Sequence, residues 1–326
     1  MIAIVIPTIN RSKYLRRALA FYDKTDFNGI IYVADSSKPE EKQKNLEHCQ
    51  AANGNGLSVV YHYFEGPHDG EVIRQLNQHL HSSIKYVTFA GDDDFQVPKG
   101  LYRCAEFLDN NLDYVAAHGH RANFFLTDKN QVRLSNIRYG YNWDDSWSPL
   151  DRFKEYMGVG IALANYLYRK DLWIKRYQYC QGIPVRYLGG ELVQEAIVAM
   201  AGKVKFLTDC VSFLFYQDNP DRLFSFDKTP LFDLVNSELW ARSYTATLSA
   251  LVQSCPEDIP EVEKRKVIEQ ELCRHIISVM SVQYTAKYGP EGNKFKPSQV
   301  DTDFGLLAPL IADNLRMVEQ IVQNES

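Results

Sequence analysis

Three consecutive carboxylates follow an apolar run near residue 90 of this chain. The run from Ile84 to Ala90 leads through Gly91 into Asp92-Asp93-Asp94. Unpaired acids side by side raise one another's pKa, so a hard divalent cation with oxygen ligands, Mg²⁺ or Mn²⁺, would neutralise them and could hold a phosphate. The alternative is a solvated acidic turn closed by Pro98, the usual role of a charge run. The apolar run that leads directly into the acids favours the cation site.

Polar side chains also follow two earlier apolar runs. Ile2–Ile6 leads into Pro7-Thr8 and then Arg11, and Ile30–Ala34 leads into Asp35. In an open parallel sheet, ligands bind beyond the carboxyl ends of the strands. There a threonine could bond a base edge, an arginine could pair with phosphate, and an aspartate could accept hydrogen bonds from a base or a ribose. Each is an ordinary loop residue when taken alone, so the prediction depends on their convergence at one edge.

The pattern between these residues predicts alternating strands and helices. Ile2–Ile6 and Ile30–Ala34 are continuously apolar, which is typical of strands buried on both faces of a mainly parallel sheet. Apolar residues recur at helical spacing in the segments that follow. We expect an α/β fold with further strands at about 57–64, 86–90, 114–118, 121–125, 166–168, 204–207 and 211–216, and with helices at about 12–22, 69–80, 101–110 and 191–201.

The character of the chain changes near Pro230. Beyond it, three segments carry apolar residues three and four positions apart, at about 231–251, 260–284 and 305–322. We therefore predict a sheet domain at residues 1–229 and a helical C-terminal region at residues 230–326. The apolar stripes of these helices must pack on the sheet domain or on a second subunit, which would also allow a homo-oligomer.

Composition narrows the class of protein. With 326 residues, of which 45% are apolar, the chain can bury a full core. A net charge of −5 and the absence of a Lys/Arg-rich block argue against nucleic acid as a partner. The six cysteines are scattered without a metal-binding spacing, which fits a reducing compartment. No window approaches the ~20 apolar residues of a membrane span, so we expect a cytoplasmic protein.

The motifs at these three strand ends resemble the family 2 glycosyltransferases, which have the GT-A fold. The matching stretches are Ile4 to Arg11, Val33 to Ser37, and Tyr86 to Asp94 followed by Val97-Pro98. Their order and spacing match as well. The resemblance covers roughly residues 1–220, whereas the helical C-terminal region has no matching motif.

The resemblance implies roles for individual residues. Thr8 and Asp35 would hold the nucleoside, Asp92 would lie near the ribose, and Asp93 or Asp94 would bind the metal on the diphosphate of the donor. In the predicted helix before the acidic strand, Asn77 matches a recurrent family asparagine. Arg74, one turn earlier, would be a donor contact, or equally a solvated arginine on the helix surface. The predicted donor-binding set is thus Pro7, Thr8, Arg11, Asp35, Arg74, Asn77 and Asp92, with Asp93 and Asp94 on the metal.

The catalytic base of the family is usually an aspartate in a Glu-Asp pair that opens a helix. Here Gly190-Glu191 occupies that place, so the chain departs from the pattern. Glu191 can still accept a hydroxyl proton, and a helix N-terminus would favour its charged form. The alternative is that Glu191 only satisfies the start of the helix. Glu195, one turn later, is the second candidate.

The resemblance predicts a metal-dependent, inverting glycosyltransferase of the hexosyltransferase type. It would move a sugar from a nucleotide-diphosphate donor, with a UDP-sugar expected first, to a hydroxyl of a glycan or other acceptor. Two alternatives remain open: a non-catalytic GT-A-like protein that binds nucleotide or glycan, and a sugar-phosphate nucleotidyltransferase. The latter begins with a Gly-rich loop, and no such loop follows Ile6. Acceptor specificity would lie in the aromatic segment Tyr139–Pro149 and in the C-terminal helices.

Overall fold

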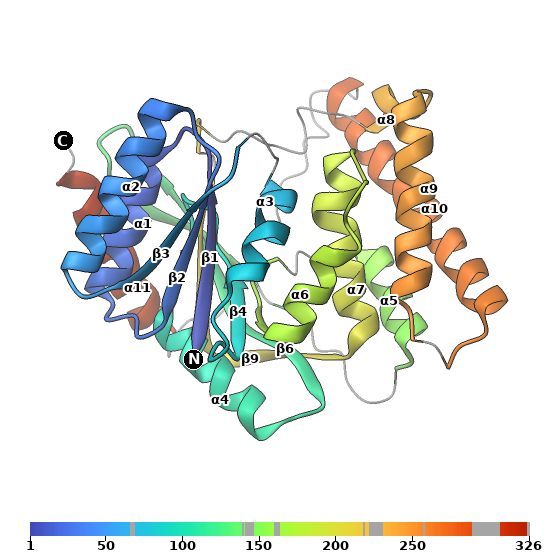
Figure 1. Cartoon of the computed structure of the whole chain (residues 1–326), viewed down its shortest axis with the longest axis horizontal. Coiled ribbons are helices and arrows are strands. Elements are labelled where there is room, and N and C mark those ends of the chain that lie inside the picture. Colours follow the sequence, from blue (N-terminus) through green and yellow to red (C-terminus); the bar gives the residue numbers. More distant parts are fainter. Residues whose placement is uncertain are drawn as a thin grey trace.

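A computed structural model describes residues 1–65, 69–138, 140, 147–159, 164–217, 219–221, 231–256, 258–288 and 307–324. In this part of the chain, nine strands form one sheet, which runs through the middle of the molecule (Figure 1). The strands are β1 Ile2–Thr8, β2 Ile30–Asp35, β3 Ser58–Tyr63, β4 Tyr86–Phe89, β5 Phe95–Gln96, β6 Tyr114–Leu126, β7 Val132–Arg138, β8 Leu167–Arg169 and β9 Lys203–Tyr216.

The sheet is mixed and has a parallel half. Its order is β3-β2-β1-β4-β8-β6-β9-β5, with β7 paired to β6. The first four strands in this order are parallel, and β6 is parallel to β9. The other four pairings are antiparallel. The predicted α/β class is confirmed. Most of the paired residues lie in the parallel pairings, and β8 enters between β4 and β6 in the opposite direction.

Two strands are longer than the pattern predicted. The expected pair at 114–118 and 121–125 is the single strand β6, which passes through a shift in register around Gly119. A Cβ atom on Gly119 would lie 2.5 Å from the carbonyl oxygen of Cys210, so only glycine allows this close approach of β6 and β9. Likewise, β9 continues through the polar residues between its two apolar halves.

Helices cover both faces of the sheet (Figure 1). Their bounds are α1 Ser12–Lys24, α2 Pro39–Gly54, α3 Asp69–Leu76, α4 Pro98–Asn110, α5 Pro149–Val159, α6 Lys170–Gln178, α7 Val193–Ala201, α8 Leu231–Leu234, α9 Glu238–Ser254, α10 Glu261–Tyr288 and α11 Ala308–Gln323. A short 3₁₀ turn, η1 Asn77–His79, follows α3, and a π-helical turn, η2 Tyr187–Leu192, leads into α7. Of these, α2, α5 and α6 were not predicted from the sequence.

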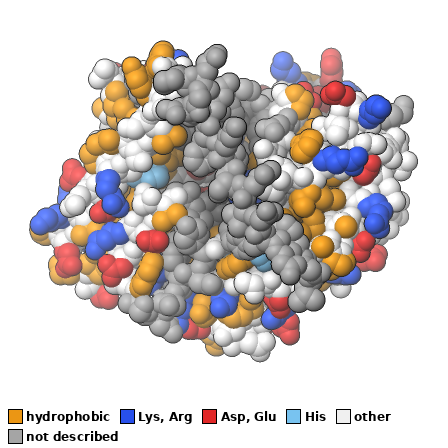
Figure 2. All heavy atoms as spheres, turned by 180° about the vertical axis from the view of Figure 1, so that it is seen from behind, with side chains coloured by type: hydrophobic (Ala, Val, Ile, Leu, Met, Phe, Trp, Pro, Cys, Tyr) orange, Lys and Arg blue, Asp and Glu red, His pale blue; other side chains and the backbone are white. Residues whose placement is uncertain are grey.

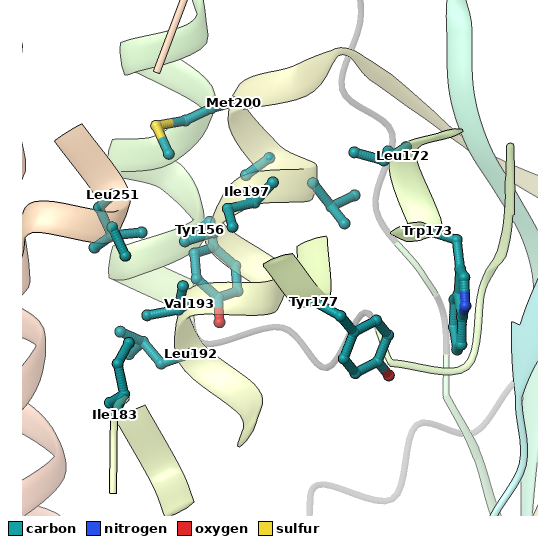
Figure 3. Packing of buried hydrophobic residues seen from close by; sticks show 14 of the residues in the cluster. Tyr156, Leu172, Trp173, Tyr177, Ile183, Leu192, Val193, Ile197, Met200 and Leu251 are labelled. Carbon is teal, nitrogen blue, oxygen red and sulfur yellow. The ribbon is translucent and has the colours of Figure 1, made fainter. Parts of the chain in front are cut away.

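Each face of the sheet has its own hydrophobic core. One core lies between the sheet and helices α3, α5, α6, α7, α9 and α10. Figure 3 shows part of it, with Leu251 of α9 on one side, Val193 and Ile197 of α7 in the middle, and Trp173 of α6 on the other side. The second core lies between the opposite face and helices α1, α2, α4 and α11.

The C-terminal helices do not form one separate unit. Helices α9 and α10 contribute Leu251, Ile268 and Leu272 to the first core. The last helix, α11, contributes Leu315 and Val318 to the second core and contacts α1 and β7. The described residues beyond 230 are largely helical as expected, and their helices pack on both faces of the sheet.

Acidic and basic side chains are interspersed over the described surface seen in Figure 2, and neither sign forms a continuous patch there. None of the described helices is both long enough and apolar enough to span a membrane. Most of the Tyr139–Pro149 segment, to which we assigned acceptor specificity, lies outside the described residues.

Candidate active site

The three carboxylates that follow β4 are buried. Asp92, Asp93 and Asp94 are only 4%, 6% and 7% exposed. This contradicts the alternative of a solvated acidic turn. Because the desolvation of a charge is expensive, the cluster persists only with partners that compensate it.

Residues at the end of β1 provide two of these partners. The Thr8 hydroxyl donates to Asp92 Oδ2 at 2.8 Å. Arg11 places Nη1 3.4 Å from Asp92 Oδ1 and Nη2 3.0 Å from Asp93 Oδ2. The Arg11 guanidinium also lies 4.5 Å from the centre of the Tyr14 ring, which holds it by a cation–π contact. The structure therefore brings Thr8 and Arg11 together with the acidic cluster, as the sequence predicted.

The end of β9 closes the cluster from another side. The backbone N–H of Tyr216 donates to Asp94 Oδ1 at 2.9 Å, and Asn219 Nδ2 donates to Asp93 Oδ2 at 2.6 Å. The Tyr14 hydroxyl donates to Asn219 Oδ1 at 2.9 Å and lies 2.5 Å from Asp221 Oδ2. Sequence reasoning did not place Tyr14 here. It noted Asn219 only as the residue near which the family often has a histidine, and its contact with Asp93 does not follow from a local pattern.

The electrostatics of the cluster follow from burial and charge. Burial raises the pKa of Asp92 well above its usual range, opposed by the charge of Arg11, while the charge of Asp93 raises it further. Burial alone would lower the pKa of Arg11, but the carboxylates of Asp92 and Asp93 hold it above its ordinary value. Arg11 is thus the fixed counter-charge of the cluster.

The carboxylates of Asp93 and Asp94 are the oxygen ligands that the cluster could offer to a divalent cation. A Cβ atom on Gly91 would lie 3.0 Å from Asp93 Oδ1 and 3.1 Å from Asp94 Oδ2, so both oxygens lie close to the backbone of Gly91. The described residues contain no group of three or more His, Cys, Asp or Glu side chains arranged around a metal. Mg²⁺ and similar ions are commonly held by one or two carboxylates together with substrate phosphates and water, and Asp93 and Asp94 can supply that number.

Asp35 is fully buried at the end of β2. Its carboxylate accepts hydrogen bonds from the backbone N–H of Ser37 at 2.8 Å, from Asn45 Nδ2 at 2.9 Å and from the Tyr61 hydroxyl at 2.7 Å. The same strand end is joined to β1, because the N–H of Ser36 donates to the carbonyl of Thr8. The structure thus gives Asp35 a structural role at the edge where the nucleoside contact was predicted.

The predicted contacts on α3 and η1 have partners within the protein. Asn77 accepts a hydrogen bond from Trp173 Nε1 at 2.7 Å. Arg74 makes two hydrogen bonds to Glu71, at 2.7 and 2.6 Å. Pro7 lies within β1 and pairs in register with Ala34 of β2. These contacts fix local structure, and the role of the three residues in donor binding stays a prediction.

Glu191 does not open a helix. The helical backbone begins at Tyr187 with the π-helical turn η2 and passes through Gly189-Gly190 without a break, so the expected stabilisation by a helix N-terminus is wrong. Glu191 is exposed, whereas Glu195 is 7% exposed and accepts a hydrogen bond from the Tyr156 hydroxyl at 3.2 Å. Of these two carboxylates, that of Glu191 is accessible to solvent.

The family model for glycosyl transferase family 2 matches residues 3–172, just over half of the chain. The chain belongs to glycosyl transferase family 2. It is therefore a glycosyltransferase, and the matched part contains the acidic cluster and Arg11. Glu191 and Asn219 lie beyond it. No curated protein matches the chain.

This family 2 glycosyltransferase is similar in fold to solved structures of S. aureus TarS. The structure of TarS 1-349 in complex with UDP has a TM-score of 0.51 and 13% sequence identity, and the match covers 99% of this chain and 90% of that chain. TarS 1-349 alone has a TM-score of 0.46 and 15% identity, and the match covers 93% of this chain and 99% of that chain. TarS 1-349 in complex with UDP-GlcNAc has a TM-score of 0.45 and 13% identity, with 93% and 99% covered. The GT-A-like fold is thereby confirmed.

Proposed function

We propose that this glycosyltransferase moves a sugar from a nucleotide-diphosphate donor to an acceptor hydroxyl with inversion, and that it uses Mn²⁺ or Mg²⁺. The observation that carries the proposal is the buried cluster of Asp92, Asp93 and Asp94 beside Arg11. Three buried carboxylates lie at the carboxyl end of a parallel strand, where ligands bind in open α/β sheets, and they provide the oxygen ligands that a divalent cation prefers. A cation bound there would stabilise the charge that develops on the diphosphate as it leaves.

The residues around the cluster would orient the diphosphate. Arg11 Nε is buried and has no hydrogen-bond acceptor among the described residues, so this N–H is available to a phosphate oxygen. Asn219 and Tyr216 hold Asp93 and Asp94 from the other side, so that the carboxylates need not reorganise when the donor binds. Asp93 and Asp94 are the residues that would hold the cation.

Glu191 would act as the general base. Its carboxylate would take the proton from the acceptor hydroxyl as that oxygen attacks the anomeric carbon of the sugar. The bond from this carbon to the diphosphate oxygen breaks on the opposite side, which inverts the configuration. We favour Glu191 over Glu195 because Glu195 is buried and bonded to Tyr156. A buried carboxylate with a protein donor is poorly placed to receive a proton from an incoming acceptor.

UDP is the first nucleotide to test. One TarS structure of the same fold holds UDP, and a UDP-sugar is the donor that the sequence motifs led us to expect. The acceptor would be a glycan or another hydroxyl compound. Its binding site would include the segment around residues 139–149.

Calorimetric titration of UDP tests the role of the cluster. With Mn²⁺ present, UDP should bind, and a chelator should weaken binding by about 10-fold or more because the phosphate loses its bridging cation. Asp93→Asn should have a similar effect. Asp113→Asn is the matched control, because Asp113 is an exposed acid outside the cluster that pairs with Lys203. Equal UDP affinity with and without the chelator would remove the metal from the proposal.

Thermal-shift measurements extend the test to the donor. A ligand that binds only the folded state raises the apparent stability, so UDP-, GDP-, dTDP- and CDP-sugars can be compared with and without Mn²⁺. We expect at least one nucleotide sugar to raise the melting temperature and to be hydrolysed slowly. No binding of any of the four classes would overturn the proposed donor.

A further inference from the structure

The C-terminal helix α10 is hydrogen-bonded to the turn that carries Glu191. The Tyr187 hydroxyl, at the start of η2, lies 2.6 Å from His275 Nε2, and His275 Nδ1 lies 2.7 Å from the carbonyl oxygen of Met157. A carbonyl only accepts, so Nδ1 carries the proton and Nε2 accepts from Tyr187. One imidazole thus joins α10, the end of α5 and η2.

The surroundings of His275 keep it in this arrangement. The side chain is 7% exposed, and the planes of its ring and of the Tyr187 ring differ by only 7°, with the ring centres 6.2 Å apart. Burial lowers the pKa of His275, so the ring stays neutral and keeps an acceptor at Nε2. The bond to Tyr187 is therefore a stable feature at neutral pH.

A second hydrogen bond joins α9 to the segment that enters the turn. The backbone N–H of Val185 donates to the hydroxyl of Ser243, which in turn donates to the carbonyl of Leu239. Ser243 is fully buried. Around this bond, Leu251 of α9 packs in the same core as Ile183 and Leu192 (Figure 3). Two helices from the C-terminal part of the chain thus hold one short segment.

The segment itself has an unusual backbone. π-Helical turns are rare and are frequently found at functional sites. In η2, a Cβ atom on Gly189 would lie 2.7 Å from the carbonyl oxygen of Ile183, so the turn packs directly against the preceding backbone. An unusual backbone conformation persists only where the surrounding structure stabilises it. The described contacts with α9 and α10 stabilise this turn.

Glu191 follows Tyr187 within the same turn. Burial raises the pKa of Tyr187 above its ordinary value, and the nearby negative charges of Glu191 and Glu195 raise it further. A shift of η2 would therefore move the Glu191 carboxylate directly. Small displacements of a reacting group lower a rate strongly.

We propose that His275 is a positioning residue for sugar transfer: through its hydrogen bond to Tyr187 it fixes the π-helical turn that presents Glu191 to the acceptor. The inference rests on the proposed role of Glu191 as the base. The C-terminal helices lie outside the part of the chain that the family model matches. In this proposal, α10 contributes to the reaction by positioning Glu191.

Hydrogen exchange tests, without any ligand, whether the bond between Tyr187 and His275 stabilises the turn η2. Tyr187→Phe keeps the ring and removes only the hydroxyl, so the protein should stay folded. The amides of residues 187–192 should exchange about 10-fold faster, while those of α4 stay unchanged, because one restraint on the turn is lost. The control is Tyr284→Phe, at an exposed tyrosine of α10. Unchanged exchange at residues 187–192 would overturn the proposal.

A double-mutant cycle tests whether the effect passes through Glu191. UDP release from UDP-glucose or UDP-N-acetylglucosamine in the presence of Mn²⁺, with water as acceptor, gives the rate. Tyr187→Phe should lower kcat by about 10-fold in the wild-type background with little change in KM, and by less than about twofold in the Glu191→Gln background.

The outcomes separate the two proposals. Equal losses in both backgrounds would mean a general structural role for Tyr187 and would overturn the positioning role. A wild-type rate for Tyr187→Phe alongside an impaired Glu191→Gln would overturn the positioning role and leave the base in place. A near wild-type rate for Glu191→Gln would overturn the base assignment and this inference with it.

Discussion

Arg11 Nη2 and Asp93 Oδ2 lie 3.0 Å apart, and more than nine-tenths of each side chain is buried. The pair joins the start of α1 to the loop after β4. Because the charges are desolvated, each depends on the other, and the loss of one partner leaves the other uncompensated. The same pair places a positive charge beside the acids of the proposed donor site.

Replacement of Arg11 by methionine should therefore destabilise the protein strongly. Without the guanidinium, two buried carboxylates lose their counter-charge, and the free energy of unfolding should fall by about 3 kcal/mol or more at neutral pH. Urea unfolding measures the change. Arg16→Met, at an exposed position of the same helix, should change it by less than about 0.5 kcal/mol. Equal urea midpoints for the two variants would show that the ion pair contributes little.

The convergence of these residues at one edge of the sheet was predicted from the sequence, for a physical reason. Strands β1, β2 and β4 are short apolar runs, and parallel strands bring their carboxyl ends to one edge. Thr8, Arg11 and Asp92 therefore meet, although they are separated along the chain by up to 84 positions. What the pattern could not show is the burial of the acids and their closure by Asn219, because these depend on how the end of β9 packs.

The sequence was less informative where the backbone departs from regular geometry. Gly189-Gly190 suggested the start of a new helix, but the chain forms a π-helical turn there, because Gly189 packs against Ile183. Periodicity also showed that α11 has a buried face, but not that this face would reach across to α1 and β7. An amphipathic pattern shows which side of a helix is buried, but it does not show which other element that side packs against.

Asp35→Ala should lower both stability and nucleotide affinity. Three hydrogen bonds to the buried carboxylate are lost, and the free energy of unfolding should fall by about 3 kcal/mol. If Asp35 also contacts the nucleoside, the affinity for UDP should fall in calorimetric titration. Tyr61→Phe removes one donor to Asp35 and should lower stability alone. UDP affinity unchanged in Asp35→Ala would make the role of this residue purely structural.

The packing of α11 on α1 can be tested by a substitution that places one charged side chain in their interface. Val318 is 1% exposed in the second core, so Val318→Asp would bury a carboxylate and should lower the free energy of unfolding by several kcal/mol. Gln320→Asp places the same charge at an exposed position of α11 and should have little effect. The two variants differ only in which face of the helix receives the charge. Similar thermal unfolding of both would contradict the observed packing.

The buried imidazole of His275 should make stability depend on pH. Burial lowers its pKa in the folded protein, whereas in the unfolded chain it titrates near the ordinary value of about 6.5. The unfolded state then binds more protons as the pH falls below 6.5, so the contribution of His275 is fully present above that value and is lost below it.

Urea unfolding at pH 5.5 and 7.5 measures this effect. Stability should fall more steeply on acidification in the wild type than in His275→Gln, by at most about 1.4 kcal/mol per pH unit. Other histidines with lowered pKa values, such as His120, are present in both proteins and cancel in the comparison. Parallel pH profiles would mean that His275 does not resist protonation in the folded state.

The sharpest prediction concerns the two glutamates of η2 and α7. Glu191→Gln keeps the shape of the side chain but cannot accept a proton at neutral pH, so it should lower kcat by about 10²-fold or more with little change in donor affinity. Glu195→Gln should reduce the rate less, because Glu195 is buried against Tyr156. Single-turnover transfer at saturating donor compares the two. A near wild-type rate for Glu191→Gln would exclude it as the base, and an equally active Glu195→Gln would require a base elsewhere in the chain.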